Sequence, residues 1–145
     1  MPPDRLVRPV ASPGIPTKAA AHPEVRVKPR LRGVLHQYAF FVSLVSGTLL
    51  VVLGVTTRAA IAAAIYAASV SALFGVSALY HRVTWTGPAR RRMRRLDHTM
   101  IFLLIAGTYT PVGLLVLQGT LATVVLVVVW GGAAAGIVLE LAWTK

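Results

Sequence analysis

Four apolar runs, each long enough to cross a lipid bilayer, constrain this chain more than any other feature. They cover about residues 34–55, 59–80, 99–117 and 120–142, and Glu140 is the only formal charge inside them. Because an α-helix rises about 1.5 Å per residue, roughly 20 apolar residues span a hydrocarbon core of about 30 Å. The sequence therefore predicts an all-α fold, a polytopic membrane helical bundle with four transmembrane helices.

The charged residues, 13% of the chain, lie almost entirely outside the apolar runs, and the formal net charge is +11. Such a basic chain could bind nucleic acid, but its lysines and arginines flank apolar runs, where anionic lipid headgroups attract them. We therefore expect the lipid bilayer and anionic lipid headgroups as partners, and no nucleic acid. The chain contains no cysteine, which excludes disulfides and thiolate metal sites.

Nearly all of the basic residues fall on one side of the predicted spans. They occur in the proline-rich segment 1–33, in the loop 81–97 and at Lys145, whereas only Arg58 falls on the opposite side. Cytoplasmic segments carry an excess of lysine and arginine, so we expect these three parts in the cytoplasm and the protein in the cell (inner or plasma) membrane. Segment 1–33 is predicted to be a disordered basic tail without a cleavable signal peptide, followed by a transmembrane domain over 34–145.

Small residues are abundant in the second and fourth runs, and they favour close packing between helices in lipid. The fourth run contains a small-xxx-small spacing from Gly132 to Gly136. Inner faces left without partners could also make the protein a homo-oligomer. In the third run, Pro111 removes a backbone hydrogen bond to Gly107 and is expected to kink the helix, with neighbouring threonine hydroxyls satisfying the freed carbonyl.

Three residues that could carry chemistry are predicted to lie at similar depth near the cytoplasmic membrane face. Ser77 and His81 are four apart and share one helix face, and Asp97 opens the next predicted span. A neutral imidazole binds zinc, a carboxylate binds zinc or holds a zinc-bound water, and a hydroxyl supports such a site with a hydrogen bond. The alternative is structural: His81 lies at the lipid interface, and Asp97 caps the N-terminus of its helix.

Two further histidines reach the same face. A site made of His36, His81 and His98 would supply three nitrogen ligands. However, His98 directly follows Asp97, and neighbours on a helix point about 100° apart, so the two cannot easily face one central site. Glu140 lies near the cytoplasmic end of the fourth run, where pairing with an arginine of the basic loop is simpler than a role in chemistry.

Four strings of residues are distinctive in combination. They are Arg32-Gly33-x-x-His36, Ser77-Ala-Leu-Tyr-His81-Arg82, Arg94-Arg95-Leu-Asp97-His98 and Ile105-Ala-Gly-Thr-Tyr-Thr-Pro111. Together they resemble the hemolysin III family, which is related to the adiponectin and progestin receptors and, more distantly, to alkaline ceramidases. The resemblance covers roughly residues 28–143.

The resemblance implies a seven-helix membrane fold with a zinc site near the cytoplasmic face. In the family pattern His81 is a direct zinc ligand, Asp97 holds or activates the zinc-bound water, and Ser77 supports the site. The pattern ends with a His-x-x-x-His pair on the seventh helix, but this sequence stops at Lys145 after four spans and lacks that pair. Two of the three expected zinc ligands are therefore missing. We expect a fragment, a truncated product or an incomplete gene model that holds a partial zinc site.

These features leave three functions open. The first is a membrane regulator or receptor-like protein, and the second is a zinc-dependent hydrolase of lipid amides, which would need Asp97 for turnover. The third is cytolysis by membrane permeabilisation, which the family name suggests and liposome conductance would detect. Because the spans carry no polar stripe to line a water-filled pore, we rank the regulator first and the pore last. We expect enzymatic activity, if any, in full-length relatives and not in this short chain.

Overall fold

The computed structural model describes residues 33–142, which form four long helices and one short π-helical segment. The helices are α1 (Val34–Val52), α2 (Thr57–Arg82), α3 (Gly87–Pro111), the π-helical η1 (Val112–Val116) and α4 (Gly119–Ala142). Residues 33–142 contain no strand, and the prediction of an all-α fold with four long apolar helices is confirmed. Apart from Gly33, the predicted tail lies outside the described residues.

All four helices are long and apolar enough to cross a membrane. Their candidate spans contain 19, 26, 30 and 24 residues, with the third running through α3 and η1. Large apolar side chains point outward along every helix, and the Val55 side chain beyond α1 is 95% exposed. Apolar surface on this scale would drive aggregation in water, whereas lipid tails solvate it. The chain is therefore a multi-pass membrane protein.

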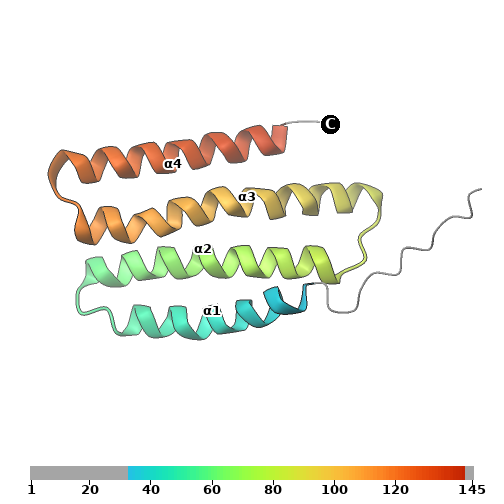
Figure 1. The fold of residues 1–145 in the computed structure, drawn as a ribbon, viewed down its shortest axis with the longest axis horizontal. Helices are drawn as coiled ribbons and strands as arrows, with labels where there is room; N and C mark the ends of the chain where they lie inside the picture. Colours follow the sequence, from blue (N-terminus) through green and yellow to red (C-terminus); the bar gives the residue numbers. More distant parts are fainter. Residues whose placement is uncertain (1–32, 143–145) are drawn as a thin grey trace, which may run out of the picture.

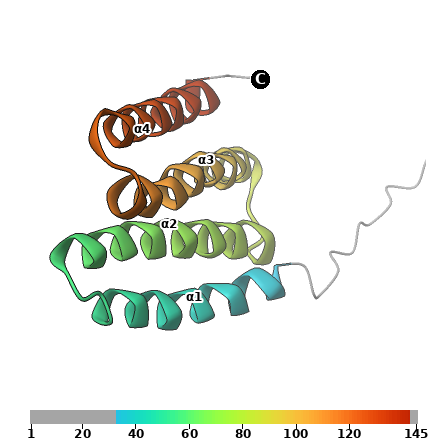
Figure 2. The ribbon, with the colours of Figure 1, turned by 60° about the vertical axis from the view of Figure 1, so that its left-hand side comes forward.

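The helices lie side by side in a single row, in the order of the sequence (Figures 1 and 2). Within residues 33–142, α1 packs on α2, α2 packs on the third span formed by α3 and η1, and that span packs on α4, whereas spans that are not consecutive do not pack together. Successive helices run in opposite directions. One end of the row holds the turns at 53–56 and 117–118, and the other holds Gly33, the connection 83–86 and the end of α4.

The connection between α2 and α3 is shorter than the sequence predicts. The loop was expected to cover 81–97, but α2 continues through Arg82 and α3 begins at Gly87, so only residues 83–86 connect them. Hydropathy locates the lipid-crossing part of a helix and carries no signal for a polar extension of it. Arginine is a good helix former, and Pro88 fits the first turn of a helix, so α3 continues well beyond its apolar part.

Small residues bring neighbouring helices close together. A Cβ atom added to Gly47 would lie 2.5 Å from Ala67 Cβ, and one added to Gly136 would lie 2.6 Å from the Phe102 ring. By contrast, a Cβ at Gly132 would meet nothing within 4 Å, so only Gly136 of the small-xxx-small spacing packs closely on another helix. The expected close packing is confirmed where glycine contacts the neighbouring helix.

Pro111 marks the point where the winding of the third span changes. The α-helix ends there, and the π-helical turn of η1 follows, closed by a hydrogen bond from the Leu117 N–H to the Val112 carbonyl. The threonine hydroxyls do not satisfy the Gly107 carbonyl as expected. Thr110 Oγ1 donates to Ala106 O at 2.8 Å, one residue earlier in the helix. The helix thus accommodates the backbone hydrogen bond that Pro111 cannot make by winding into a wider, π-helical turn directly after it.

Candidate functional site

Contacts between neighbouring helices fix which residues share one depth in the membrane. Gly107 on α3 packs against Ser69 on α2, and the two helices are antiparallel. Ser77 lies eight residues after Ser69 on α2, and Thr99 lies eight residues before Gly107 on α3. Ser77 and Thr99 therefore lie at the same depth. By the same count, Asp97 lies at a depth between Ser77 and His81. These three residues occupy the end of the row that holds the connection 83–86.

His81 is packed between aromatic rings near the end of α2. Its ring is stacked on that of His36 from α1, with 6.0 Å between the centroids, and lies 4.9 Å from the ring of Tyr80. Ser77, one turn earlier on α2, is buried, whereas His81 is half-buried. The structure thus brings His36 beside His81. From the sequence, these two histidines were considered together only as part of a site that also included His98.

The start of α1 lies against His81 because residue 33 is a glycine. Gly33 caps α1 with a φ of 82°, in the left-handed region where a side chain is strained. A Cβ atom at this position would lie 2.7 Å from His81 Cβ and 3.3 Å from Arg82 Cγ. The glycine of the Arg32-Gly33-x-x-His36 string therefore allows α1 to begin directly on the end of α2, although Arg32 itself lies outside the described residues.

Asp97 lies inside α3 and does not cap it. The N-cap residue is Thr86, and α3 begins ten residues before Asp97, so the structural alternative for this carboxylate is wrong. The Asp97 side chain is half-buried, and it forms no hydrogen bond or ion pair with another residue in the range 33–142. A half-buried carboxylate without a partner remains available to bind a cation or a water.

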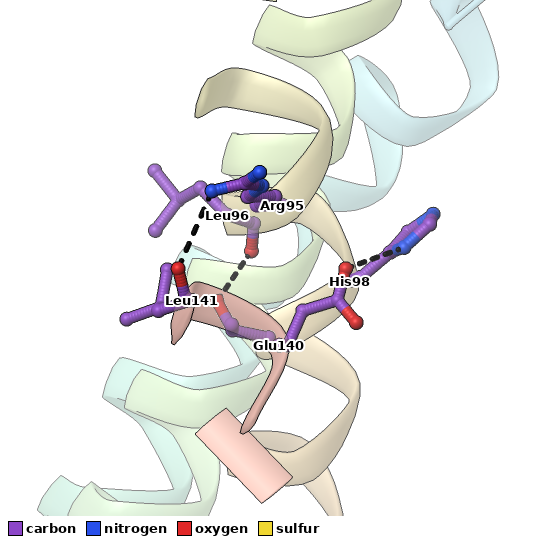
Figure 3. A network of polar contacts seen from close by, with 6 residues as sticks. Arg95, Leu96, His98, Glu140 and Leu141 are labelled. Atoms are coloured by element: carbon purple, nitrogen blue, oxygen red, sulfur yellow. Dashed lines mark hydrogen bonds and ion pairs between the residues drawn. The ribbon is translucent and has the colours of Figure 1, made fainter. Parts of the chain in front are cut away.

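The His98 side chain lies beside Glu140 of α4 (Figure 3). Its Nδ1 lies 3.2 Å from Glu140 Oε1, while Arg95 donates a 3.3 Å hydrogen bond to the Leu141 carbonyl near the end of α4. The expected pairing of Glu140 with an arginine is therefore wrong, since the histidine takes that position. Arg95 instead binds a terminal carbonyl of α4, where a helix end favours positive charge.

The three-histidine alternative fails for the same reason. Because His98 faces α4, it does not join the pair formed by His36 and His81. Among the residues that the structure describes, no three His, Cys, Asp or Glu side chains lie close enough together to hold one metal ion. The described part of the chain thus brings no complete metal site together.

Residues 105–111 contribute to packing between helices, a role that was not predicted from the sequence. Gly107 provides the close approach to Ser69, and the Thr110 hydroxyl accepts a 3.1 Å hydrogen bond from Trp130 Nε1 on α4. Trp130 therefore ties α4 to α3. The partner of Thr110 depends on the register of two helices, which no local pattern reveals.

The sequence of this chain is similar to known proteins over most of its length. A family model described as "Haemolysin-III related" matches residues 25–145. The chain is 34% identical over 90 residues to "Hemolysin-3" of Bacillus cereus, covering 62% of this chain and 41% of that protein. It is 40% identical over 81 residues to "Hemolysin-3 homolog" of Bacillus subtilis (strain 168), covering 56% of this chain and 38% of that one. The chain thus spans about two fifths of the length of these relatives. No solved structure matches it.

Proposed function

We propose, from the premise that this chain belongs to the haemolysin-III-related family, that it is a membrane regulator or receptor-like protein with a partial zinc site at the cytoplasmic face. The observation that carries this proposal is the position of His81. It lies one turn from the buried Ser77, beside His36, and at nearly the depth of the unpartnered Asp97. In this arrangement His81 binds the metal directly, Asp97 acts through a water, and Ser77 supports the site.

The donor set fits zinc in kind but not in number. Imidazole nitrogen and carboxylate oxygen are ordinary zinc ligands, and a catalytic site usually combines three protein ligands with an open position for water. Residues 33–142 bring no such group of three together. Zinc bound at a complete site would act as a Lewis acid. The residues present here supply only part of such a donor set.

Permeabilisation, the activity in the names of the two relatives, has less support in the packing. Six serine and threonine residues of the described helices are buried. Exposed ones such as Ser46, Thr108 and Thr123 lie on three different helices, among exposed apolar side chains. A water-filled pore needs a continuous polar lining. The buried hydroxyls instead make short bonds within the row, such as that between Ser43 Oγ and Ser71 Oγ at 2.9 Å.

The zinc content of the purified chain tests this proposal. After a mild chelator wash in detergent, we expect well under one zinc per chain by mass spectrometry of the metal, because metal affinity falls when ligands are missing. His81→Ala should remove most of the zinc that remains. His98→Ala is the matched control and should change little, since His98 faces α4. Near-stoichiometric zinc that is lost in both His36→Ala and His98→Ala would overturn the partial site.

We also propose that the end of the row near His81 lies in the cytoplasm. Exposed arginines gather there on the first turns of α3, namely Arg90, Arg91, Arg92 and Arg94. Arg95 lies level with Leu141, so α3 continues about 12 Å past this point at about 1.5 Å per residue. Each basic side chain near an anionic membrane surface contributes about 1 kcal/mol, so anionic headgroups would bind this extension.

Cysteine labelling in intact cells tests the orientation. The chain has no cysteine of its own, so a single Gly87→Cys variant carries one thiol, at an open position at the start of α3. We expect a membrane-impermeant thiol reagent to leave it unlabelled until the cells are opened. Val55→Cys, in the turn at the opposite end, should be labelled from outside. The reverse pattern would contradict the assigned topology.

A further inference from the structure

A groove between α1 and α2 opens near the end of the row that contains His81. Its volume is about 330 Å³, and it is lined by Gln37, Phe40, Gly75, Ala78, Leu79 and Arg82. The wall is apolar along the helices, and the two longest polar side chains, Gln37 and Arg82, stand among the last residues toward the helix ends. The groove thus combines an apolar channel with a positive charge at one end.

Two glycines shape this groove. The Phe40 ring lies over Gly75, where an added Cβ atom would come within 3.0 Å of its Cε2 atom. At the charged end, Gly33 allows the start of α1 to lie against the aliphatic stem of Arg82. A Cβ atom added to Gly33 would lie 3.3 Å from Arg82 Cγ. Part of the aliphatic stem of Arg82 is thus packed, while the residue as a whole remains exposed, as is usual for an arginine at a membrane interface.

The guanidinium of Arg82 has no anion in the described part of the chain. The one ion pair among residues 33–142 joins His98 to Glu140, two helices away. Neither the guanidinium of Arg82 nor the side-chain amide of Gln37 forms a hydrogen bond with another described residue. A guanidinium offers a planar set of donors that matches a phosphate group, and hydrogen bonds between charged groups are the strong ones.

We propose that this groove binds one anionic phospholipid, with an acyl chain along the wall formed by Phe40, Gly75 and Ala78 and the phosphate on Arg82 and Gln37. Arg82 is the last residue of a membrane-spanning helix, where lipid phosphates lie, and the apolar wall descends from it into the span. A second hollow between α1 and α2, of about 300 Å³ and lined by Ser43 and Ser71, has no charged residue and offers no such headgroup contact. The inference depends on the bilayer placement and not on the zinc site.

Lipid retention by the purified full chain tests the proposal. The protein is exchanged into nanodiscs of equal parts phosphatidylglycerol and phosphatidylcholine, released into detergent, and analysed by native mass spectrometry. We expect one retained phosphatidylglycerol per chain, and about tenfold less in Arg82→Gln, since a hydrogen bond between charged groups is lost. Ala78→Leu fills the wall while keeping the charge, and it should reduce retention comparably.

Two matched controls separate this groove from general attraction to basic residues. Arg58→Gln lies at the opposite end of the row, and Arg90→Gln lies on the exposed start of α3. Both should retain lipid as the parent does, because an attraction of about 1 kcal/mol between one exposed arginine and the headgroups is too weak to hold a lipid in detergent. Added glycerol phosphate should not displace the retained lipid. An equal loss in Arg90→Gln, no loss in Ala78→Leu, or displacement by glycerol phosphate would each overturn the proposal. If Arg82→Gln does not fold, Arg82→Lys takes its place, with partial retention expected, and the roughly tenfold loss in Ala78→Leu still tests the proposal.

Discussion

Gly107→Ala is expected to lower the free energy of unfolding by about 1–2 kcal/mol, although alanine is the better helix former by about 1 kcal/mol. The added methyl group would overlap the Ser69 side chain of α2, with its Cβ only 2.5 Å away and its hydroxyl closer still. Overpacking of this kind costs about 1–3 kcal/mol or more and should outweigh the gain in helix propensity. Reversible unfolding in SDS, followed by circular dichroism, measures the change.

A matched glycine and a compensating substitution make this test specific. Gly131 is also helical, but a Cβ there would meet nothing within 4 Å, so Gly131→Ala should be neutral or slightly stabilising. Ser69→Gly removes the overlapping side chain, and adding Gly107→Ala to it should then cost little. If Gly107→Ala alone were as stable as Gly131→Ala, the close approach of α2 and α3 at this point would be wrong.

Gly33→Ala is expected to lower stability by about 2–3 kcal/mol and to detach the start of α1 from α2. Two costs combine: the φ of 82° disfavours any side chain, and the new Cβ would lie 2.7 Å from His81 Cβ. Amide hydrogen exchange over the first turn of α1 should become faster. Because His81 must move as well, the zinc that the chain retains should fall in the same variant.

Gly119 separates these two costs. It is the other described glycine with a positive φ, at 60°, and a Cβ added to it would meet nothing within 4 Å. Gly119→Ala therefore carries the backbone strain alone, and we expect it to cost about 1 kcal/mol. The difference between the two variants measures the contact with His81. Equal effects of Gly33→Ala and Gly119→Ala on stability would show that this contact contributes nothing.

The apolar spans could be predicted because the length of an apolar run is read directly from the local sequence. The polar extensions of the helices could not be predicted from hydropathy. The first turns of α3 contain arginines that carry no hydropathy signal, so the predicted span began at residue 99, twelve residues after the helix does at Gly87. This error also placed Asp97 at a helix start, where a capping role looked reasonable. Helix propensity and Pro88 at the first turn carried the missing information.

The candidate site was predictable within one helix and not between helices. Ser77 and His81 are four apart, so their shared position follows from the helical repeat. The partner of His98 depends on which residue of α4 lies at its depth, and that residue is Glu140. This register follows from packing such as that of Gly136 on Phe102. A single sequence contains the glycine but not the identity of the side chain that lies over it.

The single row of helices also determines how the chain can come apart. Within residues 33–142, each span packs only on the span before it and the span after it, so removing α1 exposes α2 without disturbing the contact between α3 and α4. A pulling force should therefore detach helices one at a time, starting with α1 when it acts on the N-terminal end and with α4 when it acts on the C-terminal end. During synthesis the same geometry lets every new helix dock on a partner that is already in the bilayer, because all of its contacts are with neighbouring segments.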